Sequence, residues 1–320
     1  MSSFTLALDI GGTHITAALI GPQGIWPGSS VRAPITEAWP AERILETWAQ
    51  TALTAACAGP ACQQIVASMP GPFDYQHGVA LFNQKMLALT DLNIHQQLRQ
   101  RWTGTPLEGL PLTFINDAAA FALGELYYGQ GRGVGRLLGV TLGTGFGSGF
   151  LVNGQVITSG PEVPAGGTIW QLPLRGGVAE DFVSGAWVQR HYADLTGRRC
   201  DVQQIAEHAQ QGEAAALQVF RQFGQDIGEA LATCVQHFKP DLIVVGGQIS
   251  RAWPLFGGPA QQRLLPFKLA RSDLLDHANL LGAAHAAARR SQAAPPDLPG
   301  LQPARVHSPS TPLPDGGSYE

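Results

Sequence analysis

The chain has 320 residues, a formal net charge of −4 and a sequence pI of about 6.1, and 44% of its residues are hydrophobic. This length and composition allow two domains with sizeable cores. The acidic balance and the lack of a basic block argue against nucleic acid as the main partner, although a few local donors would suffice to bind an anionic small ligand.

The cysteines and the apolar runs exclude further classes. A zinc site needs ligands in close pairs, so we expect the four cysteines to be small hydrophobes of the core instead; they are Cys57, Cys62, Cys200 and Cys234. Nothing resembling a signal peptide precedes Phe4, and no run of about 20 apolar residues occurs. The sequence therefore predicts a soluble cytoplasmic protein with no membrane partner.

The first predicted elements are two strands, over residues 4–10 and 14–20, which are apolar and rich in β-branched residues. Asp9 precedes their connecting turn, which consists of Gly11, Gly12 and Thr13. Dinucleotide folds and Walker loops place glycines between a strand and a helix. Here a strand follows, which argues against a nicotinamide-dependent dehydrogenase. Two interpretations of the turn remain. It is a structural turn next to a solvent-exposed carboxylate, or its glycines allow backbone N–H groups to approach an anion without obstruction from Cβ atoms.

The next elements are a helix over 41–58, a strand over 63–71 that ends in a Pro-Gly loop, and a strand and alanine-rich helix within 112–129. Asn116 and Asp117 fall where that strand ends. Asn and Asp are good helix caps, and this is one interpretation. The other is that Asp117 acts as a general base for a substrate hydroxyl that attacks phosphorus, with Asn116 binding a neighbouring hydroxyl.

A second glycine-rich hairpin follows over 136–155, with Gly143, Thr144 and Gly145 at its turn. It lies 131 residues after the first hairpin (Gly143 against Gly12), and the repeat suggests two related halves. Helices are expected over about 181–194 and 213–238, then a strand within 239–250 that reaches Gly246 and Gly247, then a helix over 278–290. The proline-rich segment 291–320 is expected to be a disordered tail.

Two glycine turns, one from each half, could bind a polyphosphate from both sides through their backbone N–H groups. Asp9 would repel phosphate unless a cation lies between them. Mg²⁺ favours one or two carboxylates together with water and phosphate oxygens, so Asp9 fits an outer-sphere magnesium anchor, with no direct protein ligand to the metal expected.

Five segments in order and spacing resemble the ROK family of sugar kinases and sugar-responsive repressors; they span residues 6–20, 69–74, 115–125, 140–154 and 240–250. The resemblance covers about residues 4–290. It implies an α/β, ribonuclease-H-like fold of the actin and hexokinase type, with two lobes and with ATP and sugar in the cleft between them. The implied small N-terminal lobe is 1–116 with 276–290, and the larger C-terminal lobe is 117–275. A homodimer is also implied.

The resemblance further implies roles for individual residues. The two phosphate loops would be Gly11–Thr13 and Gly143–Gly145, and the turn beside adenosine would be Gly246 and Gly247. Asp117 would be the catalytic base. The sugar contacts would be Gly71, Asn83, Asn116, Asp117 and Glu180.

The segment 160–185 departs from the family pattern, because a Gly-Glu-x-Gly-His sugar motif and a zinc-binding cysteine cluster are absent. No structural zinc is therefore expected. The missing family Glu falls near Gly167, with Glu162 as one replacement, and the substitutes for lost sugar contacts are Ile169, Trp170 or Gln171. Glu180 is equally interpretable as a surface carboxylate. His14 stands where the family often has Lys, but on an alternating strand such a residue more often faces solvent than contacts phosphate.

The sequence therefore predicts ATP-dependent, magnesium-assisted phosphorylation of a hexose or related sugar, glucokinase-like, with a small-molecule sugar as partner. The alternative is a non-catalytic sugar-binding regulator that keeps the kinase fold. The repressors of the family carry a DNA-binding helix-turn-helix ahead of the first phosphate loop. Only three residues precede Phe4 here, which argues against that branch.

Overall fold

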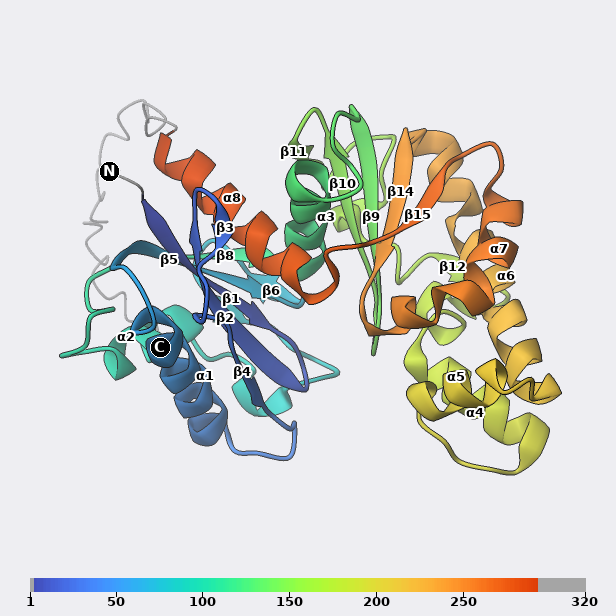
Figure 1. Ribbon diagram of the computed structural model, residues 1–320, viewed down its shortest axis with the longest axis horizontal. Helices are drawn as coiled ribbons and strands as arrows, with labels where there is room; N and C mark the ends of the chain where they lie inside the picture. The colour runs from blue at the N-terminus through green and yellow to red at the C-terminus, as the bar shows by residue number, and fades with distance from the viewer. Residues whose placement is uncertain (1–2, 293–320) are drawn as a thin grey trace, which may run out of the picture.

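The computed structural model describes residues 3–292, which form two lobes, each built on one β-sheet (Figure 1). The first sheet has the order β3-β2-β1-β5-β8, with β4 also paired to β2. Its strands are β1 (Phe4–Ile10), β2 (His14–Gly21), β3 (Gly24–Ile25), β4 (Val31–Pro34), β5 (Cys62–Met69) and β8 (Leu112–Asn116). The second sheet has the order β11-β10-β9-β14-β15. Its strands are β9 (Arg136–Leu142), β10 (Phe146–Val152), β11 (Gln155–Val156), β14 (Leu242–Gly246) and β15 (Leu269–Arg271).

The two sheets repeat one arrangement. In each, an antiparallel hairpin (β1–β2 or β9–β10) is extended by two parallel strands on the side of its first strand, β5 and β8 or β14 and β15. The repeated hairpin seen in the sequence therefore opens two sheets of the same topology. Because the parallel strands of a sheet end at the same edge, residues that follow them gather there.

Helices cover both faces of each sheet. The helices are α1 (Ala41–Ala56), α2 (Ile94–Arg101), α3 (Asp117–Tyr128), α4 (Gly185–Thr196), α5 (Val202–Gln210), α6 (Ala214–Phe238), α7 (Trp253–Leu264) and α8 (Ala278–Gln292). The shorter elements are the strands β6 (Phe73–Asp74), β7 (Val79–Ala80), β12 (Pro173–Leu174) and β13 (Gly177–Val178), and the 3₁₀ turns η1 (Leu87–Leu89), η2 (Ala165–Gly167), η3 (Ala179–Asp181), η4 (Gln248–Ala252) and η5 (Leu275–His277).

The pleat of β1 decides which of its side chains face which layer, because successive residues of a strand point to opposite faces. Leu6, Leu8 and Ile10 enter the core shared with α1. Ala7 enters a second core, shared with α3 and α8. Asp9 has the parity of Ala7, so its carboxyl group points to the side of the sheet that α8 covers.

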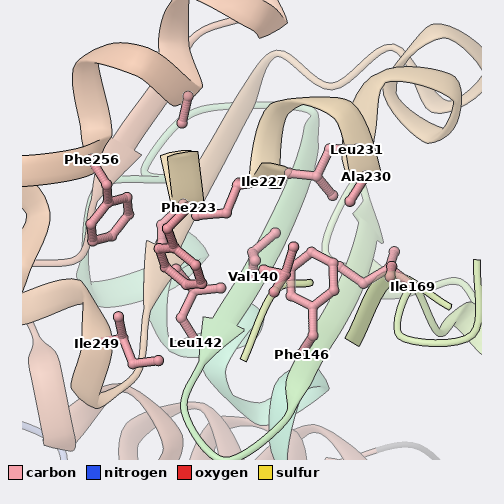
Figure 2. Packing of buried hydrophobic residues seen from close by; sticks show 14 of the residues in the cluster. Val140, Leu142, Phe146, Ile169, Phe223, Ile227, Ala230, Leu231, Ile249 and Phe256 are labelled. Carbon is pink, nitrogen blue, oxygen red and sulfur yellow. The ribbon is translucent and has the colours of Figure 1, made fainter. Parts of the chain in front are cut away.

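The C-terminal core packs α6 and α7 onto the second sheet. Phe223 of α6 and Phe256 of α7 lie over the strand residues Val140 and Leu142 of β9, with Phe146 of β10 beside them (Figure 2). All five side chains are at most 1% exposed. This core fixes the β9–β10 hairpin relative to the body of its lobe.

Helices α3 and α8 cross between the two lobes with their backbones in contact. A Cβ atom added at Gly124 would lie 2.0 Å from the carbonyl oxygen of Ala278, and one added at Gly282 would lie 1.8 Å from the carbonyl oxygen of Ala120. Neither position can hold a larger residue without separating the helices. Helix α8 packs on the first sheet and α3 on the second, so this crossing joins the lobes.

Several predicted boundaries shift. The helix predicted over 41–58 ends at Ala56, and the one predicted over 181–194 begins at Gly185, after a short 3₁₀ turn. Helix α8 continues to Gln292, past the predicted start of the tail at 291, and the remainder of that tail lies outside the described residues. Within residues 3–292, no helix combines the length and apolar character needed to cross a membrane.

Candidate active site

Asp9 lies near the carboxyl end of β1 and is tied to two other elements through one oxygen. Ser68 of β5 donates to Asp9 Oδ1 (2.7 Å), and Asn279 in the first turn of α8 donates to the same atom (2.9 Å). Burial raises the pKa of Asp9, and both hydrogen bonds oppose that rise. The second carboxyl oxygen makes no hydrogen bond within the described chain, so it is available to a hydrated cation.

Asn116 and Asp117 stand where β8 becomes α3. Asn116 is the N-cap of the helix, because its Oδ1 accepts the Ala119 N–H (3.0 Å). Its Nδ2 donates to Asp117 Oδ1 (3.1 Å) and to the hydroxyl of Tyr75 (3.0 Å). The interpretation of Asp117 as the helix cap is therefore wrong, since Asn116 fills that role. Both amide hydrogens of Asn116 are used inside the chain, one of them on Asp117, which makes Asn116 a positioning group for Asp117 and leaves one lone pair of its oxygen unused.

Asp117 is an unusually basic carboxylate. Burial raises its pKa to about 6, the nearby Asp9 carboxylate adds to the rise, and the Lys85 ammonium and the Ala118 N–H (2.8 Å from Asp117 Oδ1) act against it. A carboxylate with a pKa in this range can accept a proton near neutral pH. Lys85 was not identified from the sequence. The sequence contains one hint of its role: Lys85, one of only three lysines in the chain, lies two positions after the expected sugar contact Asn83.

Asp117 lies between the two hairpins. In the first sheet Asp9 pairs with Ser68, and Asn116 pairs with Met69 on the same strand, so Asp117 begins its helix about 10 Å from Asp9, two strand spacings away. On the other side, Ala118 packs on β10, where a Cβ atom at Gly149 would lie 2.5 Å from the Ala118 carbonyl oxygen. The glycine there lets α3 lie directly on the second hairpin.

Both glycine turns have open space around them. A Cβ atom at Gly143 would meet nothing within 4 Å, and one at Gly12 would meet only a Glu37 oxygen at 3.5 Å. Thr13 and Thr144, at the tips of the turns, are exposed. Figure 1 shows the β1–β2 and β9–β10 hairpins turning on the same side of the molecule. The exposed tips of the turns thus offer backbone and hydroxyl donors to an anion, whereas the far side of the second turn is occupied, because a Cβ atom at Gly145 would lie 2.7 Å from Glu180 Oε2.

Close packing requires glycine at positions 246 and 247. A Cβ atom at Gly246 would lie 2.3 Å from the Phe121 ring, and one at Gly247, whose φ is +82°, would lie 2.3 Å from the Leu142 carbonyl oxygen. Only glycine fits at this close approach and at this φ value. The pair brings the 3₁₀ turn η4 next to the end of β9, on the side of the second glycine turn.

The expected sugar contacts fall in three places. Gly71 lies beside the site, since its Cβ position is 3.5 Å from the hydroxyl of Tyr75, the group that also accepts from Asn116. Asn83 is exposed, on the loop that carries Lys85. Glu180 contacts the second glycine turn, where its Oε2 accepts the Phe146 N–H (2.8 Å).

The segment 160–180 is held by contacts within the chain. Ser148 of β10 donates to the Gly167 carbonyl oxygen (2.7 Å), and Arg175 pairs with Asp226 of α6 (2.8 Å) and with Glu229. Within residues 3–292, no group of three or more His, Cys, Asp or Glu side chains could hold a metal ion.

Two of the proposed substitutes in this segment are wrong. Ile169 is fully buried in the C-terminal core (Figure 2) and cannot contact a sugar. Glu162 pairs with Arg136 (2.8 Å), the first residue of β9, whereas the glycine turn follows the last residue of that strand. Trp170 is half-buried and Gln171 is exposed.

Two lobes with repeated sheets, joined by crossing helices and carrying open glycine turns and a basic carboxylate between them, define a two-lobed ATPase fold of the actin and hexokinase type. The model of the ROK family matches residues 5–289. The chain therefore belongs to the ROK family.

Known relatives span nearly the whole chain. A glucokinase from Thermotoga maritima is 25% identical over 311 residues, which cover 87% of this chain and 95% of that protein. The crystal structure of a ROK hexokinase from Thermus thermophilus aligns with a TM-score of 0.72 and 27% identity, covering 91% of this chain and 99% of that one. The crystal structure of a ROK family glucokinase from Streptomyces griseus in complex with glucose and AMPPNP aligns with a TM-score of 0.74 and 23% identity. The alignment covers 90% of this chain and 100% of that one.

Proposed function

We propose that this chain transfers a phosphoryl group from ATP to a hydroxyl of a hexose or a related sugar, with Asp117 as the general base. The coarser statement, that the chain is a sugar kinase, follows from its family and from its similarity to a glucokinase and a hexokinase over most of its length. The observation that supports the finer proposal is the half-buried carboxylate of Asp117, with a pKa of about 6, between the two hairpins that carry the glycine turns.

The role of Asp117 follows from its surroundings. Asn116 and the Ala118 N–H fix the orientation of the carboxyl group, and burial makes it basic enough to accept the proton of a sugar hydroxyl. A positioned base contributes roughly 10²- to 10⁴-fold to the rate. Gly71 and Asn83 are proposed to contact the sugar, and Asn116 is proposed to accept from it through the second lone pair of its amide oxygen. Glu180 is proposed to act at the junction of sugar and phosphate, because it lies on the second turn.

The turns and Asp9 fit an ATP–Mg²⁺ complex. Gly11–Thr13 and Gly143–Gly145 would surround the phosphates with N–H and hydroxyl donors, Gly246 and Gly247 would lie beside the adenosine, and the second oxygen of Asp9 would hold water of the magnesium shell. When bound, the cation offsets the negative charge of the phosphates. We further propose that the lobes divide after residue 116 and before 276. The expected homodimer rests on the family resemblance, and the expected cytoplasmic location rests on the composition of the sequence.

The second candidate is a sugar-binding regulator without catalysis. It is favoured by the altered segment 160–180, where the family's sugar motif is absent and Ile169 belongs to the core. A regulator has no need of a basic carboxylate at position 117, however, and the kinase remains the better proposal.

The test is release of ADP from ATP–Mg²⁺ across a panel of hexoses, amino sugars and ketoses. We expect one sugar class to stimulate turnover in the parent. Asp117→Asn should abolish that stimulation, and Asp194→Asn, a change at an exposed carboxylate of α4, should leave it intact. If no sugar stimulates turnover but sugars bind, the regulator is the correct function.

A further inference from the structure

A network of charged side chains joins the two lobes beside the glycine turns. Asp276, in the 3₁₀ turn before α8, contacts Arg32 of β4 in the first lobe (3.5 Å) and Arg251 of η4 in the second (3.0 Å). Both arginines meet the same oxygen, Oδ2. Gln248 donates to the other oxygen, Oδ1 (2.9 Å), and accepts from Arg251 Nε (3.1 Å).

Arg32 lies on the same face of the first sheet as Asp9. Strand pairing places Ser68, Asp9, Thr16 and Arg32 in one row across β5, β1, β2 and β4. Residues in such a row share a face of the sheet. Arg32 therefore projects from the same face as Asp9, two strands away from it, on the side that α8 covers.

Arg251 approaches from the other lobe. It follows the Gly246–Gly247 turn on the short turn η4, which those glycines bring against the end of β9. Its contact with Asp276 places it opposite Arg32 across the same carboxyl oxygen. The two guanidinium groups thus come from opposite lobes and meet at Asp276, which together with Arg32 lies close enough to His14, the residue after the first glycine turn, to affect its pKa.

The charges in this network are not balanced. Two guanidinium groups share one carboxylate, and their side chains remain 50% and 54% exposed. The contacts with Asp276 and Gln248 use one nitrogen of Arg32 and two of Arg251, and a guanidinium group has further donors, arranged to suit phosphate oxygens. Burial and the Arg32 charge lower the pKa of His14, which follows the first glycine turn, and the Asp9 and Asp276 carboxylates oppose that change.

We propose that Arg32 and Arg251 bind the phosphate chain of the phosphoryl donor from the two lobes, and that Asp276 is a positioning residue which holds both guanidinium groups ready for it. This rests on the proposed kinase function and names the cations that the glycine turns themselves lack. Bidentate guanidinium–phosphate contacts are among the stronger hydrogen bonds in proteins, and holding the side chains in advance reduces the entropy lost on binding.

The test measures binding of AMP, ADP and ATP, each with Mg²⁺, to the parent and to Arg32→Gln, Arg251→Gln and the double variant, by calorimetry without sugar. We expect each single change to weaken ATP binding roughly tenfold, ADP binding less, and AMP binding hardly at all. Arg198→Gln is the matched control, since Arg198 is also 50% exposed and also paired with a carboxylate, Glu213, on the surface of the C-terminal lobe. Inorganic tripolyphosphate with Mg²⁺ should compete with ATP for the parent and lose that competition in the double variant.

The positioning role of Asp276 has its own readout. Asp276→Asn keeps the shape of the side chain but removes its charge, and we expect a higher KM for ATP with an unchanged KM for the sugar. The inference is overturned if the arginine variants bind ATP as the parent does, if they lose AMP affinity equally, or if the parent binds no nucleotide. A parent that binds ATP with this phosphate dependence but phosphorylates no sugar would contradict the kinase proposal and leave the arginine assignment supported.

Discussion

Asn116 donates an amide hydrogen to Asp117 Oδ1 (3.1 Å) while its own oxygen caps the helix that Asp117 begins. The Asn116 side chain therefore both caps α3 and orients the carboxylate of Asp117, the first residue of that helix. The same amide group also donates to Tyr75, whose hydroxyl donates to the Met69 carbonyl oxygen (3.1 Å). The carboxylate is connected in this way to the end of the neighbouring strand β5.

The two duties of Asn116 can be separated by mutation. Serine caps helices about as well as asparagine but has no amide group, so Asn116→Ser should keep the free energy of unfolding within about 0.5 kcal/mol of the parent. It should nevertheless lower kcat, by roughly tenfold, because Asp117 loses an orienting donor. Asn116→Ala should lower both kcat and, by about 1 kcal/mol, the stability. Equal kcat in the serine variant and the parent would show that the amide group does not position the base.

The pH dependence of turnover should report Asp117. A general base must be deprotonated, and its pKa is about 6, so kcat/KM should rise with pH through about 6 and level off above it. Lys85→Met removes a cation that lowers this pKa and should move the rise to higher pH. Lys268→Met, at an exposed lysine, is the control and should leave the profile in place. A profile that is flat between pH 5 and 7, or is unmoved by Lys85→Met, would contradict the assignment.

The buried carboxylate of Asp117 should lower the free energy of unfolding at neutral pH. Its pKa is raised from 3.8 to about 6 in the folded chain, so between these values the folded chain binds more protons than the unfolded chain. Stability therefore falls as pH rises through this window, and the loss is complete above it. Asp117→Asn should raise the free energy of unfolding at neutral pH by about 1 to 2 kcal/mol, allowing for the partial exposure of the group. Urea unfolding at acid and neutral pH measures this; a variant less stable than the parent at neutral pH contradicts it.

Arg175 should be important for the stability of the C-terminal lobe. Its partner Asp226 is fully buried and is otherwise bonded only to Gln222 (2.7 Å). Arg175→Met leaves that carboxylate without its cation and should cost about 3 to 5 kcal/mol in urea unfolding.

The double variant Arg175→Met/Asp226→Leu is the control for this change, and it should recover most of the loss because no unpaired buried charge remains; Glu229, the other partner of Arg175, is partly exposed to solvent. A chelator should not lower the unfolding midpoint of the parent, since the contacts that hold this segment lie within the chain. A single variant as stable as the parent would show that the ion pair is dispensable.

Local chemistry explains what could be predicted from the sequence. The two hairpins have glycine turns between β-branched segments, and α6 has a long apolar stripe, so each is specified within a short window. Helix α7 was missed because Trp253–Leu264 contains two prolines and two glycines, which argue against a helix. It forms because it packs on α6, where a Cβ atom at Gly224 would lie 2.3 Å from the Phe256 carbonyl oxygen.

The charged groups around the site could not be predicted in the same way. Lys85 faces Asp117 across a long separation in sequence, and Asp276 meets Arg32 only because η5 returns to the first sheet. Such contacts depend on the completed fold, and no local pattern marks them. Asp117 was proposed from a family motif, whereas Lys85, which lowers its pKa, comes from a segment without a motif.

The crossing of α3 and α8 limits how the protein can move. At Gly124 and Gly282 the two backbones touch, so sliding one helix along the other would force the glycines past neighbouring carbonyl groups. Rotation about the point of contact avoids that collision. The least costly relative motion of the halves is therefore a scissor-like swing about this pivot, with the largest displacement at the hairpin tips, and with Asp117 and Asn279, near the pivot, moving least.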